Sequence, residues 1–220
     1  MRDRGILPAT DATLINPRQR IAVKEAVLPF KRFRTAAGTV VDTVLGPEMR
    51  STGEVMGFDT TFPLAFAKSQ AAAFGGLPKG GAAFVSMADR DKRSITFPIA
   101  RLRQLGFEIL ATEGTALVLA RNGIPSTVVR KHSQGRGPAG EPTIVDLINN
   151  GQVSLVINTP SGQGARADGY EIRAAATAAD TAIITTTQQL SAAVLAIEVI
   201  QHREFDVLSL QDAAAAAALA

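Results

Sequence analysis

The sequence predicts an α/β fold in which a doubly wound, parallel, five-stranded sheet follows a small α+β segment. From Ala82 onward, short apolar runs alternate with stretches of helical period. Such alternation is typical of parallel strands joined by crossover helices, which cover the sheet on both faces. Residues 74–81, FGGLPKGG, are rich in glycine and separate this region from the one before it.

Composition restricts the class of protein. The chain has 220 residues, 46% of them hydrophobic, which suits one large domain with a flanking segment. A net charge of +3, one tyrosine and no tryptophan give little support for a nucleic-acid partner. Without cysteine, disulfides and thiolate metal sites are excluded. No signal peptide and no apolar run of ~20 residues is recognisable, so we expect a cytoplasmic protein with no membrane partner.

Four regions are expected along the chain. Residues 1–20 lack periodicity and are expected to form a flexible lead, and residues 21–78 form a first module. Residues 79–212 form the α/β domain, and residues 213–220 are an Ala-rich tail of low complexity.

The first module is expected to contain one extended segment, one helix and a long polar loop. The extended segment lies around Val23 and ends at Pro29, and the helix runs from Phe62 to Phe74. Residues 45–57, LGPEMRSTGEVMG, are too polar for a core strand and too interrupted by glycine and proline for a helix.

The α/β domain is expected to alternate strands with helices. Strands are expected at 82–87, 107–112, 127–131, 153–158 and 182–186, with an edge strand at 207–210. Helices are expected at 95–105, 115–123, 144–151, 169–179 and 188–201.

Polar side chains follow the ends of these strands, where open parallel sheets bind ligands. The set holds hydroxyl, ammonium and amide groups, from Ser86, Lys92, Thr112, Thr115, Lys131 and Asn158. Thr112 and Thr115 flank Gly114 at a helix start, where free N–H groups and the helix dipole favour an anion. The lysines would add charge-assisted hydrogen bonds, so the pattern predicts a phosphate pocket. The alternative is that the hydroxyls are helix caps and the lysines ordinary surface residues.

Several motifs resemble the large subunit of carbamoyl phosphate synthetases. KEAVLPFKRF at 24–33 and the run at 45–57 are similar to the end of its second ATP-grasp unit. The next domain of that subunit is regulatory and built like methylglyoxal synthase, and this chain is similar to it in FVSMADRDK (84–92), ATEGTA (111–116), VIN (156–158) and DGYEIR (168–173). The resemblance covers about residues 20–212 and implies the C-terminal part of that subunit.

The resemblance implies a nucleoside monophosphate site for UMP and, in some members, IMP. The positions that match its phosphate side are those of the predicted phosphate pocket, and Asp168 and Arg173 match positions near the ribose and base. After Asn158 and Thr159, Pro160 stands where some relatives have a second threonine. Proline has neither that hydroxyl nor a backbone N–H, so effector identity stays open.

The resemblance also implies a site for the activator ornithine at the boundary between the two modules. Matching residues are Glu25, Leu28, Leu45 and Thr185. A glutamate facing an ammonium group, with leucines along the methylenes, suits ornithine. From the residues alone, the preferred interpretation of Glu25 is a solvated charge before a strand.

The complete synthetase implied by the resemblance makes carbamoyl phosphate for pyrimidine and arginine biosynthesis. It uses ATP and Mg2+, with K+ as a further candidate, and its partners are the remainder of the large subunit and a glutaminase small subunit. This chain lacks the ATP-grasp lysines, the metal-binding carboxylates and any cysteine nucleophile. No cofactor, metal or catalytic residue is therefore expected in it, and alone it should be inactive.

The alternative is a freestanding lyase of methylglyoxal synthase type. That chemistry needs a carboxylate base after a Gly-Gly pair, together with a histidine. The corresponding stretch, 133–146, has Glu141 followed by Pro142 and no Gly-Gly-Asp. His132 and His202 stand outside matching motifs, so the regulatory interpretation is favoured.

Overall fold

The computed structural model describes residues 20–27, 53–159, 165–204, 206–209 and 211–212. Leu28, Leu45 and Pro160, residues 1–19 of the lead and the Ala-rich tail lie outside these ranges. The expectations for them are therefore not addressed by the structure.

The predicted parallel sheet is confirmed. Its strands are β3 (Ala82–Met87), β4 (Glu108–Ala111), β5 (Thr127–Val128), β6 (Leu155–Thr159) and β7 (Ala182–Ile184). All neighbours are parallel, in the order β5-β4-β3-β6-β7. The two central strands, β3 and β6, are almost wholly buried because helices cover both faces.

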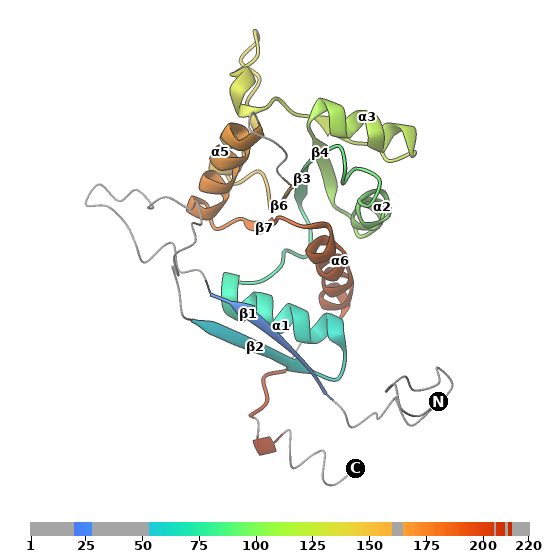
Figure 1. The fold of residues 1–220 in the computed structure, drawn as a ribbon, viewed down its shortest axis with the longest axis vertical. Helices are drawn as coiled ribbons and strands as arrows, with labels where there is room; N and C mark the ends of the chain where they lie inside the picture. Colours follow the sequence, from blue (N-terminus) through green and yellow to red (C-terminus); the bar gives the residue numbers. More distant parts are fainter. Residues whose placement is uncertain (1–19, 28–52, 160–164, 205, 210, 213–220) are drawn as a thin grey trace, which may run out of the picture.

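Helices form a layer on each face of this sheet (Figure 1). One layer contains α2 (Thr96–Gln104), α3 (Glu113–Arg121) and α6 (Thr187–His202), which pack Ile99, Leu119 and Ile197 against the sheet. The other contains α4 (Ile144–Asn149) and α5 (Ala165–Ala178), which pack Ile148 and Ile172. The sheet is therefore doubly wound, as predicted.

A smaller unit precedes the sheet. Strands β1 (Ile21–Ala26) and β2 (Glu54–Asp59) form an antiparallel pair, and α1 (Phe62–Phe74) packs on them. On its other side α1 contacts α6, and Phe66 and Ala67 belong to the same buried cluster as Ile197. The first module therefore shares a core with the α/β domain (Figure 1).

Strand β2 corrects the expectation of a polar loop through residue 57. Glu54 faces solvent and forms an ion pair with Lys24 of β1 at 2.6 Å, so no free energy is lost by burying its charge. Gly57 brings the strand close to α1, because a Cβ there would lie 1.9 Å from the Ala65 carbonyl oxygen. A strand of a two-stranded, half-exposed sheet tolerates the polarity that a core strand would not.

The expected edge strand at 207–210 is also wrong over its described residues. Residues 207–209 have no regular structure, and Val207 is exposed. The strand expected at 127–131 is shortened to β5, followed by an isolated bridge between Arg130 and Thr143. The other elements lie where expected, with ends shifted by a few residues. No helix in the described part of the chain has both the length and the apolar character that a membrane crossing requires.

Candidate functional site

The strand order creates a topological switch point between β3 and β6. From β3 the chain continues through α2 to β4, and from β6 it continues through α5 to β7 on the opposite side. Because the two connections leave on opposite faces, the carboxyl ends of these strands are the place where open α/β sheets bind ligands, in a crevice outside the strand ends. Ser86 of β3 and Asn158 of β6 are partners in register there.

Strand alternation brings the predicted polar residues to one side. Phe84, Leu110 and Val156 belong to the core on the face covered by α4 and α5. Residues two places further along an extended chain face the same side. That rule gives Ser86, Thr112 and Asn158.

Asn158 is the most informative of these residues. Its side chain is only 4% exposed, and its Oδ1 is the one buried side-chain polar atom in the described ranges that lacks a hydrogen-bond partner. An unsatisfied buried polar group costs about 1–3 kcal/mol, so a ligand group that donates a hydrogen bond to Oδ1 would relieve a real penalty. Rotation of the amide presents either its oxygen or its NH2 group. The next residue differs, because the Thr159 hydroxyl accepts from the Ala88 N–H and donates to Met87 Sδ.

The start of α3 lies at the same edge. Thr112 is its N-cap in an extended conformation, but its side chain does not cap the helix. Instead the Thr112 hydroxyl donates to Thr115 Oγ1 at 3.2 Å, which also accepts from the Met87 N–H at 3.3 Å. Two accepted bonds leave the Thr115 O–H free to donate. In the described ranges, the N–H groups of Glu113 and Gly114 also have no recorded acceptor. This end of the helix can therefore receive an anion.

Lys92 reaches this helix start from the loop after β3. Its Nζ lies 3.2 Å from the position that a Cβ would take on Gly114, so the glycine leaves room for the ammonium. The side chain is 17% exposed and forms an ion pair with Asp89 at 2.6 Å. The structure thus brings Lys92 together with Thr112 and Thr115.

Lys131 lies further out. It stands two residues after Val129, which packs in the core on the α4–α5 face. Its backbone N–H donates to Gln134 Oε1 across the short 3-10 turn His132–Gln134, and its side chain is exposed. This position suits a residue at the rim of the crevice.

Asp168 has a role that the sequence did not predict. Both of its carboxylate oxygens accept from Ser133, from the N–H at 2.8 Å and from the hydroxyl at 2.9 Å. The carboxylate therefore ties the first turn of α5 to the loop after β5. Arg173 follows five residues later on α5, about 140° around the helix, so these two residues do not share one side. No local sequence signal announces a contact between residues so far apart.

The predicted ornithine residues are only partly described. Glu25 Oε2 accepts from Gln70 Nε2 at 2.9 Å. Burial raises the pKa of Glu25, and the hydrogen bond from Gln70 opposes that rise. The Thr185 N–H donates to Gln189 Oε1, and no hydrogen bond in the described ranges joins Thr185 to Glu25. The activator site stays a prediction.

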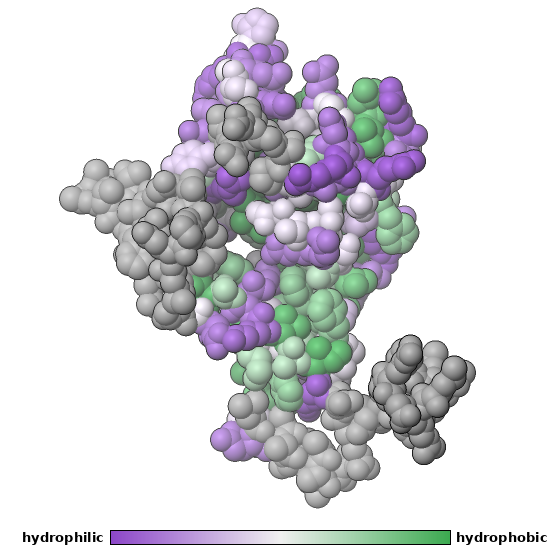
Figure 2. Space-filling view, in the orientation of Figure 1, coloured by the Kyte–Doolittle hydropathy of each residue, from purple (hydrophilic) through white to green (hydrophobic). Residues whose placement is uncertain are grey.

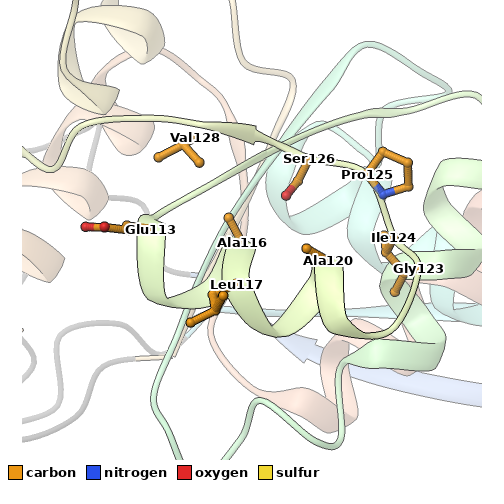
Figure 3. A pocket seen from close by; sticks show the side chains of 9 residues that line it. All are labelled: Glu113, Ala116, Leu117, Ala120, Gly123, Ile124, Pro125, Ser126 and Val128. Carbon is orange, nitrogen blue, oxygen red and sulfur yellow. The ribbon is translucent and has the colours of Figure 1, made fainter.

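A hollow of about 610 Å³ lies between α3 and residues 123–128, which lead into β5 (Figure 3). Its lining is largely apolar: Glu113, Ala116, Leu117, Ala120, Gly123, Ile124, Pro125, Ser126 and Val128. The polar residues at the carboxyl ends of β3 and β6 match the chemistry of an anion far better than this apolar lining does. In the described part of the chain, no cluster of three or more histidine, aspartate or glutamate side chains could hold a metal ion.

Residues 94–185 match the family model of the MGS-like domain. This part of the chain is therefore similar to the MGS-like domain. The match begins after β3, yet the structure places β3 at the centre of the domain's sheet, so the domain extends upstream of the matched residues.

The curated relatives that are similar to this chain in sequence are carbamoyl phosphate synthase large chains. Identity is 69% over 218 residues with that of Beutenbergia cavernae and 62% over 216 residues with that of Clavibacter michiganensis subsp. michiganensis. It is 56% over 216 residues with that of Streptomyces coelicolor. These alignments cover 98–99% of the chain but 20% of each relative, so the chain spans about a fifth of their length. The predicted resemblance to this large chain is confirmed.

Proposed function

We propose that the MGS-like domain binds a nucleoside monophosphate, such as UMP or IMP, in the crevice between β3 and β6. The observation that carries the proposal is the buried Asn158 Oδ1, which lacks a hydrogen-bond partner. Asn158 pairs with Ser86 of β3, the strand whose Met87 N–H donates to Thr115 in the first turn of α3. A phosphate at this helix end would accept from the N–H groups of Glu113 and Gly114 and from the Thr115 hydroxyl. Lys92 would supply the neighbouring positive charge, and Ser86 and Asn158 would close the site from the strand ends.

The role of this site would be regulatory. The chain would be the C-terminal part of a cytoplasmic carbamoyl phosphate synthase large chain, and ATP, Mg2+ and the glutaminase small subunit would be bound by other parts of that assembly. An effector regulates only if it binds two conformations with different affinity. A conformational change at the effector site could reach the small sheet through the contact between α1 and α6. Helix α6 begins after β7, at the carboxyl edge of the parallel sheet, and α1 packs on the small sheet.

The face of the small sheet that points away from α1 is a candidate surface for a protein partner. Lys24 of β1 and Met56 and Phe58 of β2 lie on the side opposite α1, and Met56 is exposed. Figure 2 shows apolar surface gathered over this small sheet and α1. Two-stranded sheets are marginally stable alone, and the relatives are about five times longer than this chain. The remainder of the large chain would therefore cover this face.

Calorimetric titration of the chain with UMP tests the site. Wild type should bind UMP, and uridine, which lacks the phosphate, should bind far more weakly. Lys131→Ala should lose about 1.5–3 kcal/mol, the range for hydrogen bonds to charged groups. Lys79→Ala is the matched control, because Lys79 is an exposed lysine that precedes the amino end of β3. Equal affinity of wild type and Lys131→Ala would remove that residue from the site.

Asn158→Ala addresses the observation on which the proposal depends. The variant leaves a small cavity, which lowers the free energy of unfolding, but it also removes the unsatisfied amide oxygen, which offsets part of that loss. It should bind UMP more weakly than wild type. Unchanged affinity, with the fold verified by circular dichroism, would place the ligand elsewhere.

Ornithine would bind at Glu25 as an activator. An ammonium group beside Glu25 would counter the effect of burial, which disfavours the charged carboxylate. Calorimetry with ornithine and a Glu25→Gln variant tests this. Equal heats for both proteins would exclude Glu25 as the ammonium's partner.

A further inference from the structure

The loop between β3 and α2 holds a carboxylate against the lysine of the proposed phosphate site. Asp89 Oδ1 lies 2.6 Å from Lys92 Nζ, three residues along the chain. The Asp89 side chain is 95% exposed, whereas the Lys92 side chain is 17% exposed. The aspartate thus covers the ammonium from the solvent side.

The same ammonium also faces the start of α3. Lys92 Nζ lies close to Gly114, whose N–H, like that of Glu113, has no acceptor among the described residues. An anion bound to those N–H groups would therefore meet an ammonium that already has a negatively charged partner. The ammonium of Lys92 has three N–H donors, but Asp89 and the bound anion would both be negative and close together, so each would weaken the other by repulsion.

The Asp89 side chain can leave its ion pair with Lys92 at little cost in free energy. A side chain with so little burial can turn into water without losing packing, and exposed ion pairs contribute little stability. Hydrogen bonding to Lys92 lowers the pKa of Asp89, so the competing group is a full negative charge at neutral pH. Asp91, two residues on, is different, since its nearest cation is Arg90 at 3.7 Å.

We propose that Asp89 is an internal competitor for phosphate, which occupies Lys92 in the free protein and is displaced when a phosphate monoester binds. The inference rests on the proposed function and adds a residue that sets affinity and specificity at that site. A carboxylate ligand with a single negative charge would place beside Lys92 the same charge that Asp89 already supplies, so the exchange gains no electrostatic free energy. A phosphate monoester carries about −1.5 to −2 charges at pH 7 and gains by the exchange. Asp89 therefore selects against simple carboxylates.

The test is a double-mutant cycle on the full chain, with UMP and inorganic phosphate as calorimetric probes. Asp89→Asn should bind both about two- to fivefold more tightly, the range expected from releasing one exposed ion pair. Asp91→Asn removes the same charge from the same loop and should change affinity much less. In a Lys92→Ala background, the additional Asp89→Asn change should give no gain. Acetate, a carboxylate with a single negative charge, should bind measurably only to Asp89→Asn when it is titrated into wild type and this variant.

Each contrary result has a distinct meaning. Unchanged UMP affinity in Asp89→Asn overturns the inference and leaves the proposed site standing. An equal gain in Asp91→Asn, or a gain that persists without Lys92, shows a general charge effect and overturns it as well. If wild type and Asp89→Asn both fail to bind UMP and phosphate, the proposed function itself fails. Thermal melting of each variant establishes that the fold is retained.

Discussion

At Gly57 one hydrogen atom decides whether β2 can lie on α1. A Cβ at this position would stand 1.9 Å from the Ala65 carbonyl oxygen and 2.5 Å from the Ser69 nitrogen. Both are helix backbone atoms that cannot turn aside, so the sheet and helix would have to separate. We expect Gly57→Ala to lower the free energy of unfolding by about 1–3 kcal/mol.

Gly80→Ala is the control for this substitution. A Cβ at Gly80 would meet no atom within 4 Å. Its effect should stay within about 0.5 kcal/mol, as for ordinary surface changes. Urea denaturation of the two variants would compare them, and equal midpoints would contradict the close approach of β2 to α1.

Asp146 makes the stability of the chain depend on pH. Arg136 donates to its carboxylate at 2.8 Å, and the Thr143 N–H and hydroxyl donate at 2.9 and 2.8 Å. These bonds, that from Arg136 first, lower the pKa of Asp146 from 3.8 to about 2. A carboxyl whose pKa is depressed by folding stabilises the protein above its unfolded pKa and loses that contribution as pH falls toward the folded value.

Acid melting curves check this contribution. The melting temperature of wild type should fall more steeply than that of Asp146→Asn between about pH 5 and pH 2. Above that range, wild type should be the more stable protein, because the variant lacks the ion pair with Arg136. Parallel curves for the two proteins would show that Asp146 gains nothing from its partners.

Helix α1 connects the two parts of the molecule through Phe66. This side chain is 7% exposed and packs in the cluster that includes Ile197 of α6. Phe66→Ala should cost about 3–5 kcal/mol, because it removes a buried ring at a junction between elements. Hydrogen exchange of the α1 amides should accelerate more than that of β3 amides.

Phe97 provides the matched comparison for Phe66. It lies on α2 but is 82% exposed, so Phe97→Ala should change stability by no more than about 0.5 kcal/mol. If the two alanine variants melted alike, or if α1 amides were no more affected than those of β3, the docking of α1 on α6 would be unimportant.

As a whole molecule, the chain should bind but not catalyse. The carboxylate in the region matching the methylglyoxal synthase base is that of Glu141, whose Oε2 accepts from the Ala139 N–H in its own loop. A general base contributes its usual ~10²–10⁴-fold only when it is held against the substrate proton. We expect no methylglyoxal from dihydroxyacetone phosphate and no bicarbonate-dependent ATP hydrolysis.

Colorimetric detection of methylglyoxal and phosphate-release measurements would check both activities on the purified chain. Turnover of dihydroxyacetone phosphate that disappears in Glu141→Ala would favour the freestanding lyase over the regulatory domain. Binding of UMP should still raise the melting temperature, because a ligand that binds only the folded state stabilises it.

The sequence by itself determined the layered α/β fold, most helix positions and the set of polar residues at the strand ends. Those features depend on local signals, since apolar periodicity and glycine stops set the elements, and polar residues at strand ends mark the binding edge. Lys92, Thr112 and Thr115 were predicted together for this reason, and the structure brings them together.

Only the tertiary structure decided which strands meet at the crevice and which polar groups are already satisfied. Strand order, the register of Ser86 with Asn158 and the bond between Ser133 and Asp168 join residues distant in sequence, and no local pattern encodes such pairs. Strand β2 was missed because its polarity is acceptable only in a two-stranded sheet with one face in solvent. The unpartnered amide of Asn158 is likewise a property of packing, because burial and hydrogen bonding are settled only when the strands and helices assemble.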